Sequence, residues 1–263
     1  MARAGQMYYQ RQGEGEPLLL VTGFAISAAV FEPVLDLYTP DFDCILYDHR
    51  GSARSLGGSS PRSMGGLADD AAGLLAALGV ERAHVYGVSM GGMVAQEIAL
   101  RHPQRVDRLI LGCTSAGGLR AARPGFRELA GLVAEPDLRA AALFSSEFRR
   151  RHPERARRLL RPFRAHPTPR AGVVAQMAAS ALHDTCSLLG RIAAPTLVLH
   201  GERDQLVPVR NARALAERIP DAELAVVRGA GHAYALERPE EARDLLLNWM
   251  SRTTEERHVA SHR

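Results

Sequence analysis

Short apolar runs alternate with helix-like stretches along this chain, and this alternation limits the possible folds more than any other feature. Each run has the length of a strand and stops at a turn-forming residue such as Gly or Asp. The runs are 18–21, 44–47, 83–86, 108–111, 196–199 and 224–227. Runs that are apolar at every position are typical of parallel strands buried on both faces. The pattern therefore predicts an α/β fold with a mostly parallel sheet flanked by helices.

Helices are expected over 64–78, 90–101, 209–218 and 239–250. Residues 117–189 interrupt the alternation, because they hold six prolines and no strand-like run. We expect this segment to be a helical lid inserted between two strands. The α/β core would then comprise 1–116 and 190–251. The polar stretch 252–263 is expected to be a disordered tail.

Composition excludes several kinds of chemistry. The 263-residue chain has no lysine, so a lysine Schiff base and a P-loop are both ruled out. Its three cysteines are far apart, and an odd number without a C-x-x-C pair is typical of a reducing compartment. The first residues form no apolar leader, and no stretch is long enough to span a bilayer. We therefore expect a cytoplasmic protein with no membrane contact.

Positive charge is concentrated in the predicted lid, where residues 120–170 hold 13 arginines and five acidic residues. We favour a solvated helical face as the interpretation. The alternative is a patch that attracts an anionic substrate or an acyl carrier. The block lacks the pattern of interleaved aromatic residues typical of a nucleic-acid-binding platform and has no nucleic-acid-binding signature, so no nucleic-acid partner is expected. The oligomeric state is left open.

A G-x-S-x-G motif at 87–91 marks a candidate nucleophile. A strand-like run precedes it and a helix-like stretch follows it, and in this context a sharp turn lifts the serine above the sheet. Gly87 and Gly91 let the flanking backbones pass closely, and the helix N-terminus behind Ser89 supplies free N–H groups. The alternative is a plain glycine-rich turn. The context favours Ser89 as a nucleophile.

A serine nucleophile needs a base, and two later strand exits supply candidates for a base and its partner. His232 follows the last run and Asp204 follows the one before, so the chain order is Ser, Asp, His. Glu202 competes with Asp204 for the acidic role. We favour Asp204 because the apolar stretch 206–208 follows it.

Other histidines are assigned no role. His183 and Asp184 are neighbours in the chain and would face different ways on a helix, so they form no relay. His200 is expected in the core. No cluster has metal-ligand spacing and no nucleotide-binding loop occurs, so neither a metal nor a cofactor is expected.

Residues at the strand exits should line the substrate pocket. Most are apolar, which predicts a small-molecule substrate with an apolar or aromatic part. Four phenylalanines of the predicted lid (126, 144, 148 and 163) either cover this pocket or pack the lid helices together. The expected lining residues are Phe24, Ala25, Ile26, Met90, Cys113, Thr114, Leu206, Val207, Ala233 and Tyr234.

These motifs resemble those of α/β-hydrolase fold enzymes, in the branch that includes 3-oxoadipate enol-lactonases and antibiotic-pathway methylesterases. The matching segments are 22–24, 48–55, 87–92, 194–204 and 231–239. The resemblance implies Ser89 as nucleophile, His232 as general base and then acid, and Asp204 as the residue that orients His232. It also implies an oxyanion hole made by the backbone N–H groups of Phe24 and Met90.

Two positions depart from the family pattern. Thr22 precedes Gly23 where relatives carry His-Gly, and Ala53 stands where relatives often have Gly. The serine at 89 argues against the dehalogenase and epoxide hydrolase branches, which use a carboxylate. The expected function is therefore a serine hydrolase of esters or lactones. A carbon–carbon bond hydrolase or a cyclase in the same cleft, and a non-catalytic ligand sensor, stay open as alternatives.

Overall fold

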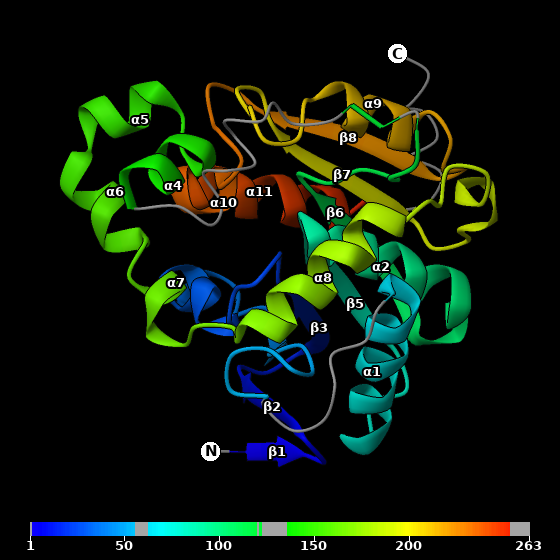
Figure 1. Ribbon diagram of the computed structural model, residues 1–263. Coiled ribbons are helices and arrows are strands. Elements are labelled where there is room, and N and C mark those ends of the chain that lie inside the picture. The colour runs from blue at the N-terminus through cyan, green and yellow to red at the C-terminus, as the bar shows by residue number, and fades with distance from the viewer. Residues whose placement is uncertain (1, 56–62, 120, 123–135, 253–263) are drawn as a thin grey trace.

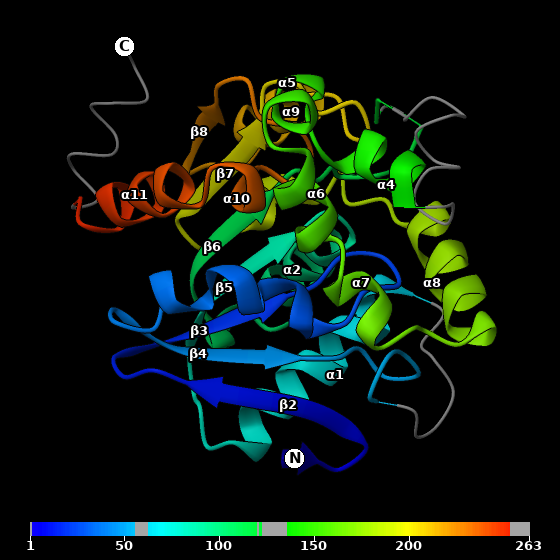
Figure 2. The same ribbon diagram turned by 90° about the vertical axis from the view of Figure 1, so that its left-hand side faces the viewer.

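A computed structural model describes residues 2–55, 63–119, 121–122 and 136–252 (Figure 1). Its centre is an eight-stranded sheet of order β1-β2-β4-β3-β5-β6-β7-β8, which Figure 2 shows stacked from β2 to β8. The strands β3 to β8 run parallel to one another, whereas β2 pairs antiparallel with both β1 and β4. The strands are β1 (Ala2–Ala4), β2 (Met7–Gln12), β3 (Glu16–Val21), β4 (Phe42–Tyr47), β5 (Ala83–Val88), β6 (Val106–Gly112), β7 (Thr196–Gly201) and β8 (Ala222–Val227).

Both faces of the sheet are covered, and this explains the continuous apolar runs. Successive side chains of a strand point to opposite faces. In β3, Leu19 and Val21 enter the core on one face, while Leu18 and Leu20 enter the core on the other. All four have at most 1% of their surface exposed. The predicted fold class is confirmed.

Helices form the two outer layers. The face of Leu19 packs on α1, α2 and α9, and the face of Leu18 packs on η1, α10, α11 and helices from the segment between β6 and β7. The helices, with η for 3-10 turns, are η1 (Ala28–Leu37), α1 (Met64–Ala77), α2 (Met90–Arg101), η2 (Pro103–Arg105), α4 (Pro136–Leu143), α5 (Ser146–Arg151), α6 (Pro153–Leu159), α7 (Pro162–Ala165), α8 (Arg170–Leu182), η3 (Leu189–Arg191), α9 (Arg210–Ala216), α10 (Tyr234–Glu237) and α11 (Pro239–Met250).

The helices α4 to α8 lie between β6 and β7 in the chain, and prolines stand at the start of several of them. Three of them begin at a proline, whose missing N–H is not needed in a first turn. Where this segment leaves and rejoins the sheet, Gly118 N donates to His183 O over 2.9 Å. Thr185 N likewise donates to Ala116 O over 2.9 Å. These bonds hold the two ends of the segment together.

Some elements differ from the expectation. The strands β1 and β2 and the turn η1 were not predicted, because 7–12 is mostly polar and η1 directly follows an apolar strand. Most of the predicted tail, 253–263, and Phe126 lie outside the described residues. Across the described ranges, the structure has no helix that combines the length and apolar character needed to cross a membrane.

Candidate active site

Ser89 lies at the sharp turn between β5 and α2. Its backbone has φ 60° and ψ −122°, a conformation that L-residues rarely adopt. A Cβ atom at position 87 would lie 2.2 Å from Gly91 O, and one at position 91 would lie 2.2 Å from Val21 O. The close backbone approach needed by this turn therefore depends on both glycines.

The loop after β6 supports this turn from below. Ser89 N donates to Gly112 O over 2.8 Å, and Thr114 Oγ1 donates to Ser89 O over 2.7 Å. Cys113, between them, is fully buried and also has a positive φ of 42°. Gly112 and Thr114 thus hold the turn in place, with Cys113 buried between them. The sequence had instead placed Cys113 and Thr114 in the pocket.

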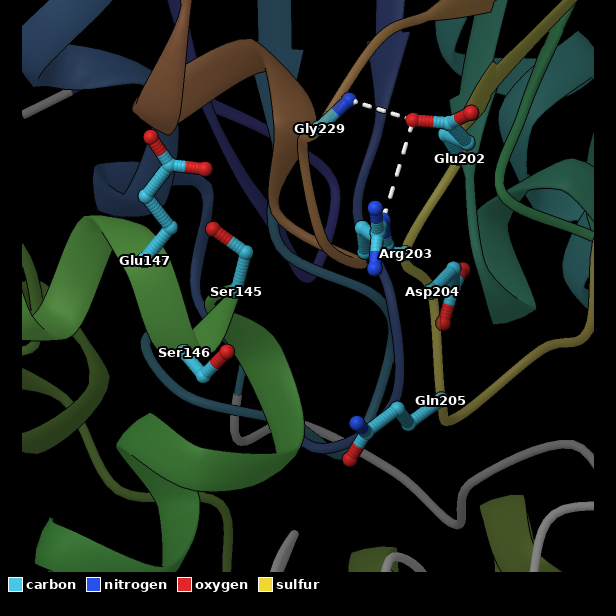
Figure 3. Close-up of a pocket in the computed structure, with 8 residues that line it drawn as sticks. All are labelled: Ser145, Ser146, Glu147, Glu202, Arg203, Asp204, Gln205 and Gly229. Atoms are coloured by element: carbon cyan, nitrogen blue, oxygen red, sulfur yellow. Dashed lines mark hydrogen bonds and ion pairs between the residues drawn. The ribbon is translucent and has the colours of Figure 1, made fainter.

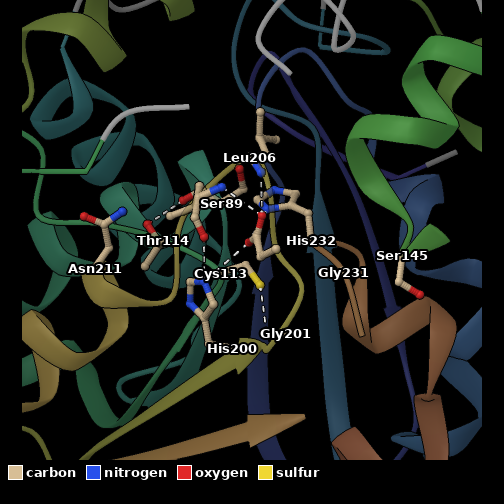
Figure 4. A network of polar contacts seen from close by, with 12 residues as sticks. Ser89, Cys113, Thr114, Ser145, His200, Gly201, Leu206, Asn211, Gly231 and His232 are labelled. Atoms are coloured by element: carbon tan, nitrogen blue, oxygen red, sulfur yellow. Dashed lines mark hydrogen bonds and ion pairs between the residues drawn. The ribbon is translucent and has the colours of Figure 1, made fainter. Parts of the chain in front are cut away.

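Asp204 and His232 come together at the exits of β7 and β8. Figure 4 shows His232, Leu206 and His200 in this network of polar contacts. His232 Nδ1 lies 2.8 Å from Asp204 Oδ2, and a carboxylate only accepts, so Nδ1 carries the proton. The other oxygen, Oδ1, accepts from Leu206 N and Val207 N, each over 2.8 Å. Whenever the ring carries a single proton, Nε2 is therefore the acceptor nitrogen of His232.

The ionisation of Asp204 is set by competing effects. Burial by itself would raise the pKa of its carboxyl, but the charge and hydrogen bond of His232 hold that pKa below its ordinary value. His200 and the amide of Val207 act in the same direction. Asp204 therefore stays a carboxylate that fixes the orientation of the imidazole.

A second imidazole touches the same carboxylate. His200 is fully buried, as the sequence predicts, and its Nε2 donates to Val207 O over 2.8 Å while lying 3.4 Å from Asp204 Oδ2. Burial lowers the pKa of His200, so its ring is neutral and acts as a hydrogen-bond donor. Its contact with Asp204 was not expected.

Cys113, Asp204 and His232 offer one atom each within 4.8 Å of one another, an arrangement that can suit a metal ion. A thiol binds a metal as the thiolate. Burial raises the pKa of Cys113 well above its ordinary value, and Asp204 and His232 already bind each other. The group is therefore better suited to holding a proton in place than to binding a cation.

Ser89 and His232 line one apolar pocket of about 80 Å³. Four predicted lining residues take part, namely Phe24, Ile26, Ala233 and Tyr234. Ala25, Cys113, Thr114, Leu206, Val207 and Met90 do not. The remaining lining residues are Gly23, Val30, Phe31, Val34, Val88, Leu143, Phe163, Ala235 and Leu236. Of the phenylalanines in question, Phe163 covers this pocket, while Phe144 and Phe148 pack against each other.

Two backbone amides beside Ser89 are available to a ligand. Met90 N is the first amide of α2, where no helical acceptor exists. Phe24 N belongs to the loop after β3, and a Cβ atom on the adjacent Gly23 would lie 3.3 Å from Ser89 Cβ. Among the described residues no acceptor pairs with either amide. The two groups could receive a negatively charged oxygen formed next to Ser89.

A second, polar cavity of about 350 Å³ lies beyond Asp204 (Figure 3). It is lined from one side by 145–147 and from the other by 202–205 and Gly229. Glu202 accepts from Gly229 N over 2.9 Å, whereas the carboxylate that accepts from His232 Nδ1 is that of Asp204. The structure thus brings Asp204, and not Glu202, to the imidazole.

A buried carboxylate connects the loop of His232 to the helices between β6 and β7. Glu237 Oε1 accepts from Ser145 N and from Gly231 N, each over 2.8 Å, and Oε2 accepts from Ser145 Oγ over 2.8 Å. Ala233 N donates to Leu143 O over 2.8 Å beside it. Gly231 and Ala233 flank His232, so these bonds fix the loop that carries it. In the sequence, Glu237 was included only within the matching segment 231–239 and was assigned no role.

We expect Glu237→Ala to destabilise the fold by about 2–6 kcal/mol, because two buried N–H groups lose their acceptor at roughly 1–3 kcal/mol each. Glu237→Gln should retain most of the wild-type stability. Its amide oxygen can accept from both backbone N–H groups, and its NH2 can donate to Ser145 Oγ. Urea unfolding at neutral pH measures the difference. Equal losses in the two variants would contradict the hydrogen-bond assignment.

A comparison of wild type with Glu237→Gln also tests the effect of the negative charge on Glu237. Burial raises the pKa of Glu237 above its ordinary 4.5, which makes ionisation harder in the folded than in the unfolded chain. Its contribution to stability is therefore greatest below that value and is lost as pH rises through the folded-state pKa. The stability of wild type relative to Glu237→Gln should therefore fall as the pH rises above 4.5. A difference independent of pH would contradict this.

Known proteins resemble the chain over nearly its whole length. A family model described as alpha/beta hydrolase fold matches residues 16–239. "Putative carbamate hydrolase RutD" of Azorhizobium caulinodans is 32% identical over 254 residues, covering 92% of this chain and 94% of the relative. The structure of a thermophilic esterase from Thermogutta terrifontis has a TM-score of 0.79 at 28% identity and covers 93% of this chain and 92% of its own. Est816, described as an N-acyl homoserine lactone degrading enzyme, has a TM-score of 0.78 at 30% identity, with 92% and 96% covered.

Proposed function

We propose, from the premise that the chain belongs to the α/β-hydrolase fold family, that it cleaves a carboxylic ester or lactone through an acyl-enzyme intermediate. That it is a hydrolase follows from the family and from its relatives. One observation carries the finer assignment. Ser89, on its strained turn, lines the same apolar pocket as His232, whose far nitrogen is bound to Asp204.

The proposed reaction begins when Ser89 Oγ attacks the substrate carbonyl carbon and His232 Nε2 takes the hydroxyl proton. Asp204 stays ionised throughout and stabilises the imidazolium by accepting a hydrogen bond from His232 Nδ1–H. The amides of Phe24 and Met90 donate to the oxyanion, and each such donor typically contributes about 2.7–4 kcal/mol in the transition state. His232 then protonates the leaving alcohol. Water, deprotonated by His232, finally releases the acid from Ser89.

The pocket suggests the size of the acyl part. At about 80 Å³ it is well below the roughly 300–1,000 Å³ of pockets that enclose drug-sized ligands. Its walls come from η1 and from Leu143 and Phe163 of the inserted helices. We infer a short apolar acyl group, with the helices α4 to α8 acting as the lid that limits its length. The proposed location remains the cytoplasm.

We expect Phe163→Ala to shift the preference toward longer acyl chains. A methylene in a hydrophobic pocket is worth roughly a 10- to 200-fold difference in kcat/KM. The ratio of kcat/KM for a p-nitrophenyl hexanoate over the acetate should therefore rise by about tenfold or more.

Leu182→Ala is the matched control, because Leu182 lies in the same inserted helices with 78% of its surface exposed. Its hexanoate-to-acetate ratio should equal that of wild type. If the hexanoate-to-acetate ratio also stays unchanged in Phe163→Ala, Phe163 does not limit the length of the acyl group.

A carbamate is the second candidate substrate, favoured by the similarity to the Azorhizobium relative. A panel of short p-nitrophenyl esters, lactones, thioesters and carbamates decides between them. We expect the highest kcat/KM on an ester or a lactone. Higher kcat/KM on a carbamate would replace the proposal.

An organophosphonate that labels Ser89 without any turnover of the panel would favour the carbon–carbon hydrolase or the cyclase. Absence of labelling would favour a ligand sensor.

A further inference from the structure

Gln176 on α8 reaches across to the loop that carries Phe24. The two lie 152 positions apart in the chain, yet the side chain of Gln176 is fully buried and its Oε1 accepts from Ala25 N over 2.7 Å. The neighbouring positions 174 and 177 on the helix are exposed. Gln176 is therefore the polar group that α8 inserts into the body of the enzyme at this point.

The loop from Thr22 to Ala25 needs such support. Ala25 has φ 55°, a left-handed conformation that costs a non-glycine residue of order 1–3 kcal/mol. At the other end of the loop, His49 Nε2 donates to Thr22 O over 3.1 Å. The loop is thus held by one side chain at each end, and the Phe24 amide lies between them. Gln176 accepts from the amide of Ala25 and not from that of Phe24, so the Phe24 amide stays available to a ligand.

The position of α8 is fixed by close contacts. A Cβ atom at position 172 would lie 2.3 Å from Gly51 O, so the first turn of the helix packs directly on the loop after β4. Ser52 Oγ lies 3.1 Å from Thr168 Oγ1 just before that turn. The loop of Phe24 is therefore tied to a helix that is itself seated on the core.

Packing alone does not account for a glutamine here. The side-chain nitrogen Nε2 of Gln176 is buried and, within the described part of the chain, has no hydrogen-bond partner. A buried unpaired donor costs roughly 1–3 kcal/mol. An apolar side chain of similar volume would avoid this cost but could not accept from Ala25 N.

We propose that Gln176 is a positioning residue that holds the Phe24 amide in place for the oxyanion and so couples the oxyanion hole to the seating of α8. This inference rests on the proposed hydrolytic function of Ser89. The side chain acts through the backbone of Ala25 and contacts neither the substrate nor Ser89.

The test replaces the acceptor while keeping the volume, in Gln176→Met and, should that variant not fold, Gln176→Leu. Both should lower kcat on a short p-nitrophenyl ester by about ten- to a hundredfold with KM changed less than about threefold. This loss is below the roughly 10²–10³-fold that removal of an oxyanion donor itself causes. A trifluoromethyl ketone, which forms a tetrahedral oxyanion adduct on a serine, should lose affinity by a similar factor.

Ser180→Ala serves as the control on the same helix, because its hydroxyl donates to the backbone oxygen of Gln176 and, among the residues that the structure describes, to no other group. It should retain wild-type kcat and ketone affinity. Wild-type kcat and ketone affinity in a folded Gln176→Met protein, or a change confined to KM, would overturn the proposal. Failure of the underlying function is separate, because it would appear as full turnover by Ser89→Ala.

Discussion

Ser89→Ala is expected to lower kcat on the preferred ester by about 10⁴- to 10⁶-fold, the range seen when a nucleophile is removed from a serine hydrolase. No other described group is positioned to replace it. Cys113, the nearest thiol, is fully buried, and burial raises its pKa well above the ordinary value. A stopped assay with p-nitrophenyl acetate, corrected for spontaneous hydrolysis, measures the loss.

The fold should survive this change. Alanine fits the same backbone angles no worse than serine, and the hydrogen bonds at Ser89 N and Ser89 O come from the backbone and from Thr114. Circular dichroism and thermal unfolding should therefore match wild type. Retention of more than about one per cent of wild-type turnover by a folded variant would refute the nucleophilic role.

Sequence reasoning located the strands and the residues at their ends because both depend on local signals. Buried parallel strands appear as continuous apolar runs, and the turn at Ser89 requires glycines at fixed positions, so Ser89, Asp204 and His232 could each be named. The sequence favoured Asp204 over Glu202 only through the apolar stretch that follows it, and the contact between Asp204 and His232 needed coordinates. The two acids stand two positions apart, and only the turn after β7 decides which of them faces the imidazole.

The pocket could not be read in the same way. The rule that strand exits line the site holds for Phe24, Ile26 and Tyr234, and it misses Cys113 and Thr114, because the exit of β6 passes beneath the serine turn. The walls from η1 and α7 come from segments whose packing no local pattern encodes. Gln176 carried no signal either, since a single glutamine among small and apolar residues is an ordinary helical position.

The asymmetric hydrogen bonds of Asp204 make a sharp prediction for Asp204→Asn. Two backbone amides, those of Leu206 and Val207, donate to Oδ1, so the amide oxygen of an asparagine would turn toward them. Its NH2 would then point at His232 Nδ1, which must become an acceptor. The ring is thereby forced to carry its proton on Nε2, where it can no longer receive the proton of Ser89.

We expect this reversed tautomer to lower kcat by about 10⁴-fold with the fold retained, as in other enzymes with such a triad. Glu202→Gln is the matched control, because Glu202 accepts from the backbone of Gly229 and lies beside Arg203 in the lining of the polar cavity. Its kcat should stay within about twofold of wild type. Comparable losses in the two variants would show that position 204 has no special role in orienting His232. A loss of less than tenfold in Asp204→Asn would show that the ring does not depend on the carboxylate, and the proposed proton transfer from Ser89 would then need another base.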